Sequence, residues 1–75
     1  MTNRDILTFC NNVALLREKN GIDKKEMANI CGISVDELAQ IEQGSLPKTL
    51  SVEIAVRLYQ HFDISVEKLF RPLSE

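Results

Sequence analysis

Apolar residues recur along this chain at helical spacing, in short runs that end near glycines. Gly21, Gly32 and Gly44 divide the first part of the sequence at similar intervals. Glycine at the far end of a helix permits the left-handed conformation that ends it. The pattern therefore predicts short helices at about residues 3–20, 24–31, 35–43 and 50–61, followed by one or two helical turns after residue 65.

Two capping signatures indicate where the second and third helices begin. Ser34 and Glu37 have the spacing of a Ser-x-x-Glu capping box, and Asp23 with Glu26 forms a variant with aspartate as the cap. In such a box the cap side chain accepts a hydrogen bond from a backbone amide of the first helical turn. The sequence therefore predicts two consecutive short helices.

The apolar stripes of short helices need a common core, because none of these helices can bury its apolar face alone. A chain of 75 residues has the length of one domain. We therefore expect an all-α fold, a compact bundle of five short helices, as a single domain over residues 1–75. One of the adjacent Ile6 and Leu7 is expected to be exposed. The side chains expected inside include those of Cys10, Cys31, Leu50, Ile54, Leu58, Phe62, Val66, Leu69 and Phe70.

Two charged residues fall on these apolar stripes. Arg17 lies four residues after Val13, and Glu42 lies four residues after Leu38. A charged side chain on a core face is unfavourable unless it is paired. We expect Arg17 and Glu42 to form a partly buried ion pair, and the alternative is that both side chains reach outward to water.

The connection between the second and third helices is only residues 32–34. So short a turn forces the two helices to cross steeply, with the small Ala28 where they touch. Ile33 would enter the core from the turn, and Leu38 would anchor the second helix from inside. This is the geometry of a helix-turn-helix over about residues 23–44, whose second helix presents an exposed face.

From about Phe9 to Phe70 the sequence resembles the phage-repressor and Cro-like helix-turn-helix domains, also called the XRE family. The order and spacing of the matches carry the resemblance, which implies a lambda-repressor-like fold. In that family an arginine and a glutamate at the positions of Arg17 and Glu42 pair inside the fold. Residues 1–8 would extend the family's first helix. The matching residues are Leu16, Arg17, Gly21, Ala28, Gly32, Ile33, Ser34, Leu38, Ile41, Glu42, Gly44, Pro47 and residues 64–70.

The resemblance implies sequence-specific binding of double-stranded DNA by a small transcriptional regulator, as a homodimer on a palindromic operator. The recognition helix would be residues 35–43, placed in the major groove. An amide pairs with adenine and a valine contacts a thymine methyl, which suits two of the implied base contacts. The implied base contacts are Gln40, Val35, Asp36 and Glu37, and the implied phosphate contacts are Lys24, Gln43 and Lys48.

In charge the sequence departs from the family's pattern. Across residues 17–48 five basic residues stand against six acidic ones, and Asp36 and Glu37 lie where DNA would be nearest. A carboxylate can accept from the N4 amine of cytosine, but that contact must overcome repulsion by the phosphates. The alternative function is therefore a degenerate helix-turn-helix whose acidic recognition-helix face binds a basic protein.

Composition and spacing argue against other function classes. The net charge of −2 disfavours a non-specific nucleic-acid binder. The sequence offers no nucleophile–base pair, no glycine-rich phosphate loop and no ligand spacing around His61, so we expect no enzyme, no cofactor, no metal and no small-molecule substrate. It also lacks a signal peptide and an apolar stretch of membrane-spanning length, which predicts a cytoplasmic protein without membrane association.

Overall fold

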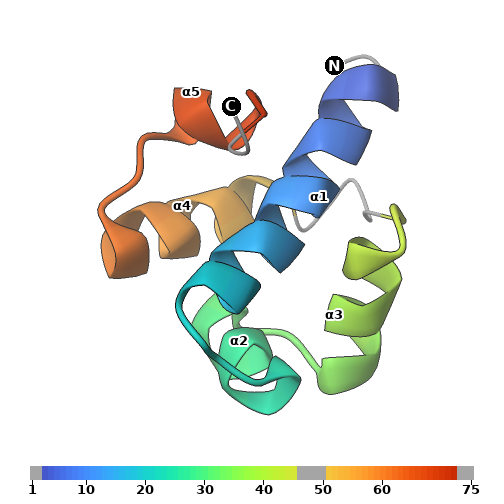
Figure 1. Ribbon diagram of the computed structural model, residues 1–75, viewed down its shortest axis with the longest axis vertical. Coiled ribbons are helices and arrows are strands. Elements are labelled where there is room, and N and C mark those ends of the chain that lie inside the picture. The colour runs from blue at the N-terminus through green and yellow to red at the C-terminus, as the bar shows by residue number, and fades with distance from the viewer. Residues whose placement is uncertain (1–2, 46–50, 73–75) are drawn as a thin grey trace.

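Five α-helices make up most of the residues that the computed structural model describes, which are 3–45 and 51–72. No strand forms in those two ranges. The helices follow the predicted order, and the boundaries of the first four lie within one residue of the expected ones. They are α1 (Asn3–Lys19), α2 (Lys24–Cys31), α3 (Val35–Glu42), α4 (Ser51–Phe62) and α5 (Val66–Leu69) (Figure 1).

The predicted caps begin α2 and α3. The Ser34 hydroxyl oxygen accepts a hydrogen bond from the Glu37 N–H at 3.1 Å, and the Glu37 carboxylate accepts one from the Ser34 N–H at 3.0 Å. At α2, the Asp23 carboxylate accepts a hydrogen bond from the Glu26 N–H at 2.8 Å. Each bond satisfies an amide that the first helical turn leaves unpaired. Local sequence thus sets both helix starts.

The end of α2 depends on Gly32, which adopts the left-handed conformation with φ 72° and ψ 31°. The next N–H, that of Ile33, donates to the Ala28 carbonyl at 3.0 Å and closes the helix end. Gly32 also lies against α4, because a Cβ added there would come within 2.8 Å of the guanidinium carbon of Arg57. Backbone conformation and close packing therefore both favour glycine at this turn.

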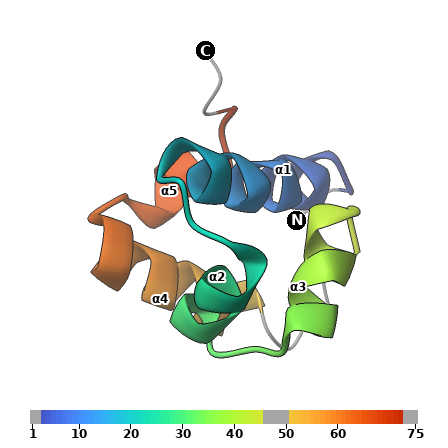
Figure 2. The ribbon, with the colours of Figure 1, turned by 60° about the horizontal axis from the view of Figure 1, so that its bottom comes forward.

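The helices surround the core with α1 lying across the others. α1 contacts α3 and α5, and α2 contacts α3 and α4. Figure 2 shows α1 on one side of the molecule and α2, α3 and α4 on the other. α3 and α4 lie at opposite ends of the molecule in both ribbon views (Figures 1 and 2).

Every helix contributes to the core. Cys10 and Cys31 belong to it as predicted, each with 1% of its surface exposed. Burial raises the pKa of both thiols, and that of Cys31 reaches about 11. Both therefore remain protonated, apolar core side chains at neutral pH. The buried apolar residues are Phe9, Cys10, Val13, Leu16, Met27, Ala28, Cys31, Leu38, Ile41, Ile54, Ala55, Leu58 and Leu69.

The inward placement expected for Val66 is wrong, since 41% of its surface is exposed. α5 is a single turn of four residues and directs one side to the core, where Leu69 is fully buried. Phe70 follows the turn and stacks on Phe9 with ring centroids 5.0 Å apart. The remaining inward predictions for α4 and α5 are confirmed, except that Leu50 lies outside the described residues.

The N-terminal residues continue α1 from Asn3. Ile6 packs against the core and Leu7 is 55% exposed, so one of the pair faces water as predicted. Asn12 is a core residue that the sequence pattern did not single out. It is fully buried, and its side-chain amide donates at 2.7 Å to the carbonyls of both Leu69 and Arg71. These bonds tie α1 to the end of α5.

Candidate nucleic-acid interface

α2 and α3 form a helix-turn-helix through the predicted three-residue connection. Ala28 is buried in α2, and Leu38 is fully buried in α3. Ile33 in the turn packs partly buried against the core. These contacts hold the buried side of α3 against the core, so the opposite side of α3 projects from the molecule.

The exposed side of α3 carries most of the residues expected to contact bases. Leu38 and Ile41 bury the inner side of the helix. Asp36 and Gln40 are exposed on the outer side, and Val35 is 42% exposed at the first helical position. The helix thus brings an amide, a carboxylate and an apolar side chain together on one surface.

Glu37 differs from the other expected base contacts because the fold already uses its carboxylate. One of its oxygens accepts the hydrogen bond from the Ser34 N–H, and the residue is partly buried. A base contact by the same oxygen would have to compete with the capping box. Glu37 therefore acts in this structure as the residue that fixes the start of α3.

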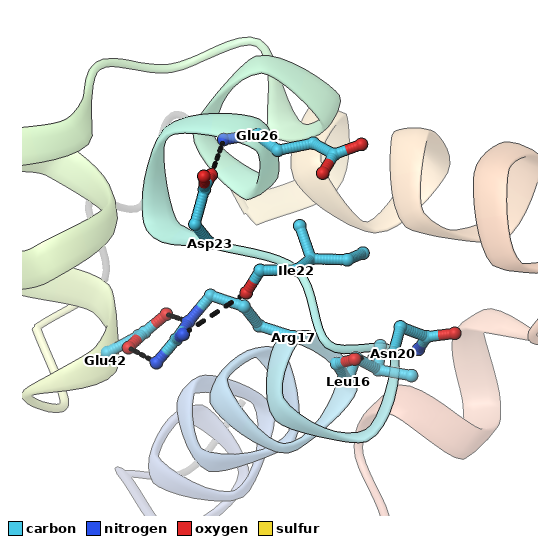
Figure 3. Close-up of polar contacts among 7 residues, drawn as sticks. All are labelled: Leu16, Arg17, Asn20, Ile22, Asp23, Glu26 and Glu42. Atoms are coloured by element: carbon cyan, nitrogen blue, oxygen red, sulfur yellow. Dashed lines mark hydrogen bonds and ion pairs between the residues drawn. The ribbon is translucent and has the colours of Figure 1, made fainter.

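Arg17 and Glu42 form the ion pair predicted from their positions on the apolar stripes (Figure 3). Arg17 Nε donates to Glu42 Oε2 at 2.8 Å, and Arg17 Nη2 donates to Oε1 at 3.1 Å. Their side chains are only 19% and 11% exposed. Arg17 Nη1 also donates to the Ile22 carbonyl at 3.4 Å. The hydrogen bonds to Glu42 raise the pKa of the Arg17 guanidinium above its ordinary value.

This ion pair joins three segments that lie apart in the sequence. Arg17 is in the last turn of α1, Ile22 is in the loop before α2, and Glu42 ends α3. A two-pronged arginine–carboxylate contact is directional as well as strong. The pair therefore fixes the C-terminal end of α3 relative to α1, while the capping box fixes its other end.

The residues expected to contact phosphates are only partly described. Lys24 is exposed at the first position of α2, and Gln43 is exposed at the C-cap of α3. Lys48 lies outside the described residues. Lys24 and Gln43 thus lie at the two ends of the helix-turn-helix, at the start of α2 and the end of α3.

A groove of about 540 Å³ runs beside the start of α3. Ala28, Ile33 and Val35 give it an apolar surface. Its polar lining is mixed in charge and comprises Asp23, Lys25, Glu26, Asn29 and Ser34. The sequence analysis singled out neither Lys25 nor Asn29. Lys25 follows the expected phosphate contact Lys24 in the sequence and could have been found from that neighbour, but nothing in the pattern marked Asn29.

The charge of this surface is mixed. α3 contains three acidic residues and no basic one. Glu42 is paired with Arg17 and Glu37 is engaged by the cap, which leaves Asp36 as the exposed acid of α3. Lys24 and Lys25 are both exposed at the start of α2. The two helices therefore present Lys24, Lys25 and the exposed Glu26 of α2 beside the open carboxylate of Asp36 on α3.

The described residues, 3–45 and 51–72, form neither a metal-ligand cluster nor a membrane-spanning helix. No group of three or more histidine, cysteine, aspartate or glutamate side chains is arranged there to hold a metal ion. None of the helices there has both the length and the hydropathy needed to cross a bilayer.

Comparison with known proteins agrees with this geometry. A sequence model of the family described as helix-turn-helix matches residues 13–69. A protein of Pyrococcus abyssi, named as a candidate HTH-type transcriptional regulatory protein, is 42% identical over 59 residues. That match covers 79% of this chain but only 17% of the archaeal protein, so this chain spans a small part of its relative's length. No solved structure gives a significant match.

Proposed function

The chain belongs to the XRE-type helix-turn-helix family, and from this premise we propose that it binds specific sequences of double-stranded DNA as a small transcriptional regulator. The observation that carries the proposal is the exposed outer side of α3, held at both ends by the capping box and the Arg17–Glu42 pair. A rigid helix with an exposed polar face fits the major groove of B-DNA.

Three side chains of α3 are proposed to contact base edges. The Gln40 amide would donate to and accept from the N6/N7 edge of adenine. Val35 would contact a thymine methyl, and the Asp36 carboxylate would accept from the N4 amine of cytosine. Glu37 would support these contacts by its cap and would reach a base only through its second oxygen.

Contacts to the DNA phosphates would position α3 in the major groove. Lys24 and Gln43 are proposed to bind phosphates on either side of it, and Lys48 is proposed as a third contact. Phosphate contacts fix register and orientation but carry no sequence information. We further propose that two copies bind a palindrome, with half-sites about one helical turn, roughly 34–36 Å, apart.

Fluorescence anisotropy with a randomised duplex pool tests the proposal, with bound sequences recovered at low and near-physiological salt. We expect enrichment of a palindrome and a clear salt dependence. Gln40→Ala should lower affinity for the selected site, whereas the matched control Gln60→Ala on α4 should not. Equal binding by wild type and Gln40→Ala would refute the assignment of this base contact.

The phosphate contacts have their own measurement. Lys24→Ala should reduce the slope of log affinity against log salt by about one. Lys68→Ala, at an exposed lysine of α5, is the matched control and should leave the slope unchanged. An unchanged slope in Lys24→Ala would exclude Lys24 from the phosphate contacts.

A second candidate function is favoured by the three acidic residues and absent basic residues of α3. In that case the outer side of α3 would bind a basic protein rather than DNA. Failure to bind any duplex at low salt, with the fold intact, would support this alternative over DNA binding.

A further inference from the structure

The connection between α1 and α2 begins with an asparagine followed by a glycine. Asn20 and Gly21 come directly after the last residue of α1, and both are exposed. Gly21 has a φ of 63°, and a Cβ added to it would meet no heavy atom within 4 Å. The backbone nitrogen of Gly21 therefore lies at an open bend, next to an exposed side-chain amide.

We propose that Asn20 is a site of spontaneous deamidation, restrained by the last turn of α1. In this reaction the Gly21 backbone nitrogen gives up its proton and bonds to the side-chain carbonyl carbon of Asn20. The bond from that carbon to the amide nitrogen breaks, and the nitrogen takes up the proton and leaves as ammonia. Water then opens the cyclic imide at either carbonyl, which gives aspartate or isoaspartate. Asparagine and water thus become an acid and ammonia, without oxidation, reduction or an enzyme.

Asn20 differs from two other exposed asparagines in the residue that follows it. Ring closure brings the next backbone nitrogen against the asparagine side chain, so a following side chain obstructs it, and glycine has none. Asn29 precedes the β-branched Ile30, and Asn11 precedes Asn12. Asn11 and Asn29 also lie within helices, where hydrogen bonds hold the next backbone N–H. Of these three asparagines, only Asn20 combines a helix end with a following glycine.

The fold engages both reacting groups at the end of α1. The Asn20 side-chain nitrogen donates to the Leu16 carbonyl at 2.7 Å (Figure 3). The Gly21 N–H donates to the Glu18 carbonyl at a longer 3.2 Å. Cyclisation needs the Gly21 nitrogen free of its acceptor and the amide turned toward that nitrogen. The reaction therefore requires this turn to open, and helix ends open at low cost in free energy.

The aspartate product would weaken the end of α1. A carboxylate in place of the Asn20 amide has no N–H to donate, so its oxygens would oppose the Leu16 carbonyl oxygen. It also adds a negative charge at the C-terminal end of a helix, where the helix dipole is itself negative. The deamidated chain should therefore be less stable than the original one.

The isoaspartate product would disturb the connection further, because the main chain then passes through the side chain and gains a methylene. Two hydrogen bonds span this segment. The Ile22 N–H donates to the Arg17 carbonyl at 3.0 Å, and Arg17 Nη1 donates to the Ile22 carbonyl at 3.4 Å. Arg17 also pairs with Glu42, so a shift of Ile22 would affect the contact that holds the end of α3. The site therefore adjoins the support of the helix that we propose binds DNA.

Peptide mapping by mass spectrometry of the wild-type chain, aged in mildly alkaline buffer, tests the proposal. Asn20 should convert to aspartate and isoaspartate, whereas Asn11 and Asn29 should remain amides over the same time. Isoaspartate is diagnostic, because direct hydrolysis of the amide gives aspartate alone. An unmodified Asn20, a product without isoaspartate, or equal conversion at Asn11 or Asn29 would overturn the proposal.

The same mapping in urea tests the restraint by the fold and the identity of the attacking atom. Two hydrogen bonds must open first, so the folded chain should react about tenfold or more slowly than the unfolded chain. In urea, Gly21→Ala should slow the reaction severalfold, because its Cβ hinders ring closure and there is no fold to disturb. Equal rates for the folded and unfolded wild type would refute the restraint. Equal rates for unfolded wild type and Gly21→Ala would refute attack by the Gly21 nitrogen.

Asn20→Asp reproduces the aspartate product in pure form and tests its consequence. Thermal melts followed by circular dichroism should give Asn20→Asp a lower midpoint than wild type. Asn11→Asp, at an exposed position within α1, is the matched control and should show a smaller decrease. Equal midpoints for Asn20→Asp and wild type would refute the expected weakening of α1. None of these measurements involves DNA, so their outcome is separate from that of the proposed function.

Discussion

The Arg17–Glu42 ion pair allows a quantitative test of how α3 is held. The Glu42 side chain is 11% exposed in the intact pair, and Arg17→Ala would leave its carboxylate without a guanidinium partner. Glu42→Ala would leave Arg17, whose side chain is 19% exposed in the intact pair, with its 3.4 Å hydrogen bond to the Ile22 carbonyl. We therefore expect both substitutions to destabilise the fold, and Arg17→Ala to do so more strongly.

The expected magnitude follows from the burial of both charges. Removing one partner of a buried pair costs about 3–5 kcal/mol, because the other charge stays desolvated without compensation. A chain of 75 residues has a total unfolding free energy of about 4–11 kcal/mol. Either single substitution thus removes a large share of the stability. The double substitution should cost less than the sum of the two, since it leaves no unpaired charge.

Urea unfolding followed by far-UV circular dichroism gives the free energies for the double-mutant cycle. Arg71 and Glu67 are the matched control, since their ion pair has the same 2.8 Å separation but side chains 72% and 73% exposed. Exposed pairs couple by at most about 1 kcal/mol. The Arg17–Glu42 coupling should exceed that value and persist at high salt, because buried pairs are screened less. Additive effects at Arg17 and Glu42 would refute the reasoning.

Three further predictions test other parts of the fold. Gly32→Ala should lower the unfolding free energy by about 1–2 kcal/mol because φ is 72°. The loss should be smaller in an Arg57→Ala background, where the guanidinium no longer crowds the new Cβ, and thermal melts of wild type, the two single variants and the double variant measure this. Asn12→Ala should cost about 1–3 kcal/mol because the buried Leu69 carbonyl loses its donor, as urea titration would show. The unfolding free energy should fall as pH rises from about 9 to about 11, because the pKa of the Cys31 thiol is 9.0 in the unfolded chain and about 11 in the fold. Comparing the urea midpoints of wild type and Cys31→Val across that pH range isolates this effect.

Features that depend on neighbouring residues were predictable from the sequence. The helix starts at Asp23 and Ser34 rest on hydrogen bonds three residues along the chain. The ion pair is a long-range contact, but it was also predictable. An unpaired buried charge is unfavourable, so two opposite charges on otherwise apolar stripes are expected to pair with each other.

Features that depend on distant backbone atoms or uncovered surfaces were not predictable. Asn12 looks like an ordinary polar residue, and its role depends on carbonyls 57 and 59 residues further along the chain. The apolar residues of α4 lie on two sides of the helix, and helical periodicity alone does not show which side the bundle covers. Val66 was misplaced for a related reason, because a one-turn helix has too few residues to define an inner side.

The acidic composition of α3 has a structural explanation that bears on its function. Glu37 completes the cap at its first turn, and Glu42 binds Arg17 at its last residue. Acidic groups near a helix start also interact favourably with the positive end of the helix dipole. The ion pair neutralises Glu42, so the negative charges that α3 would present to DNA are those of the capped Glu37 and the open Asp36, beside the exposed Lys24, Lys25 and Glu26 of α2. Since an exposed carboxylate gains most opposite the amine of cytosine, Asp36 would weaken the general attraction to DNA but increase discrimination among sequences.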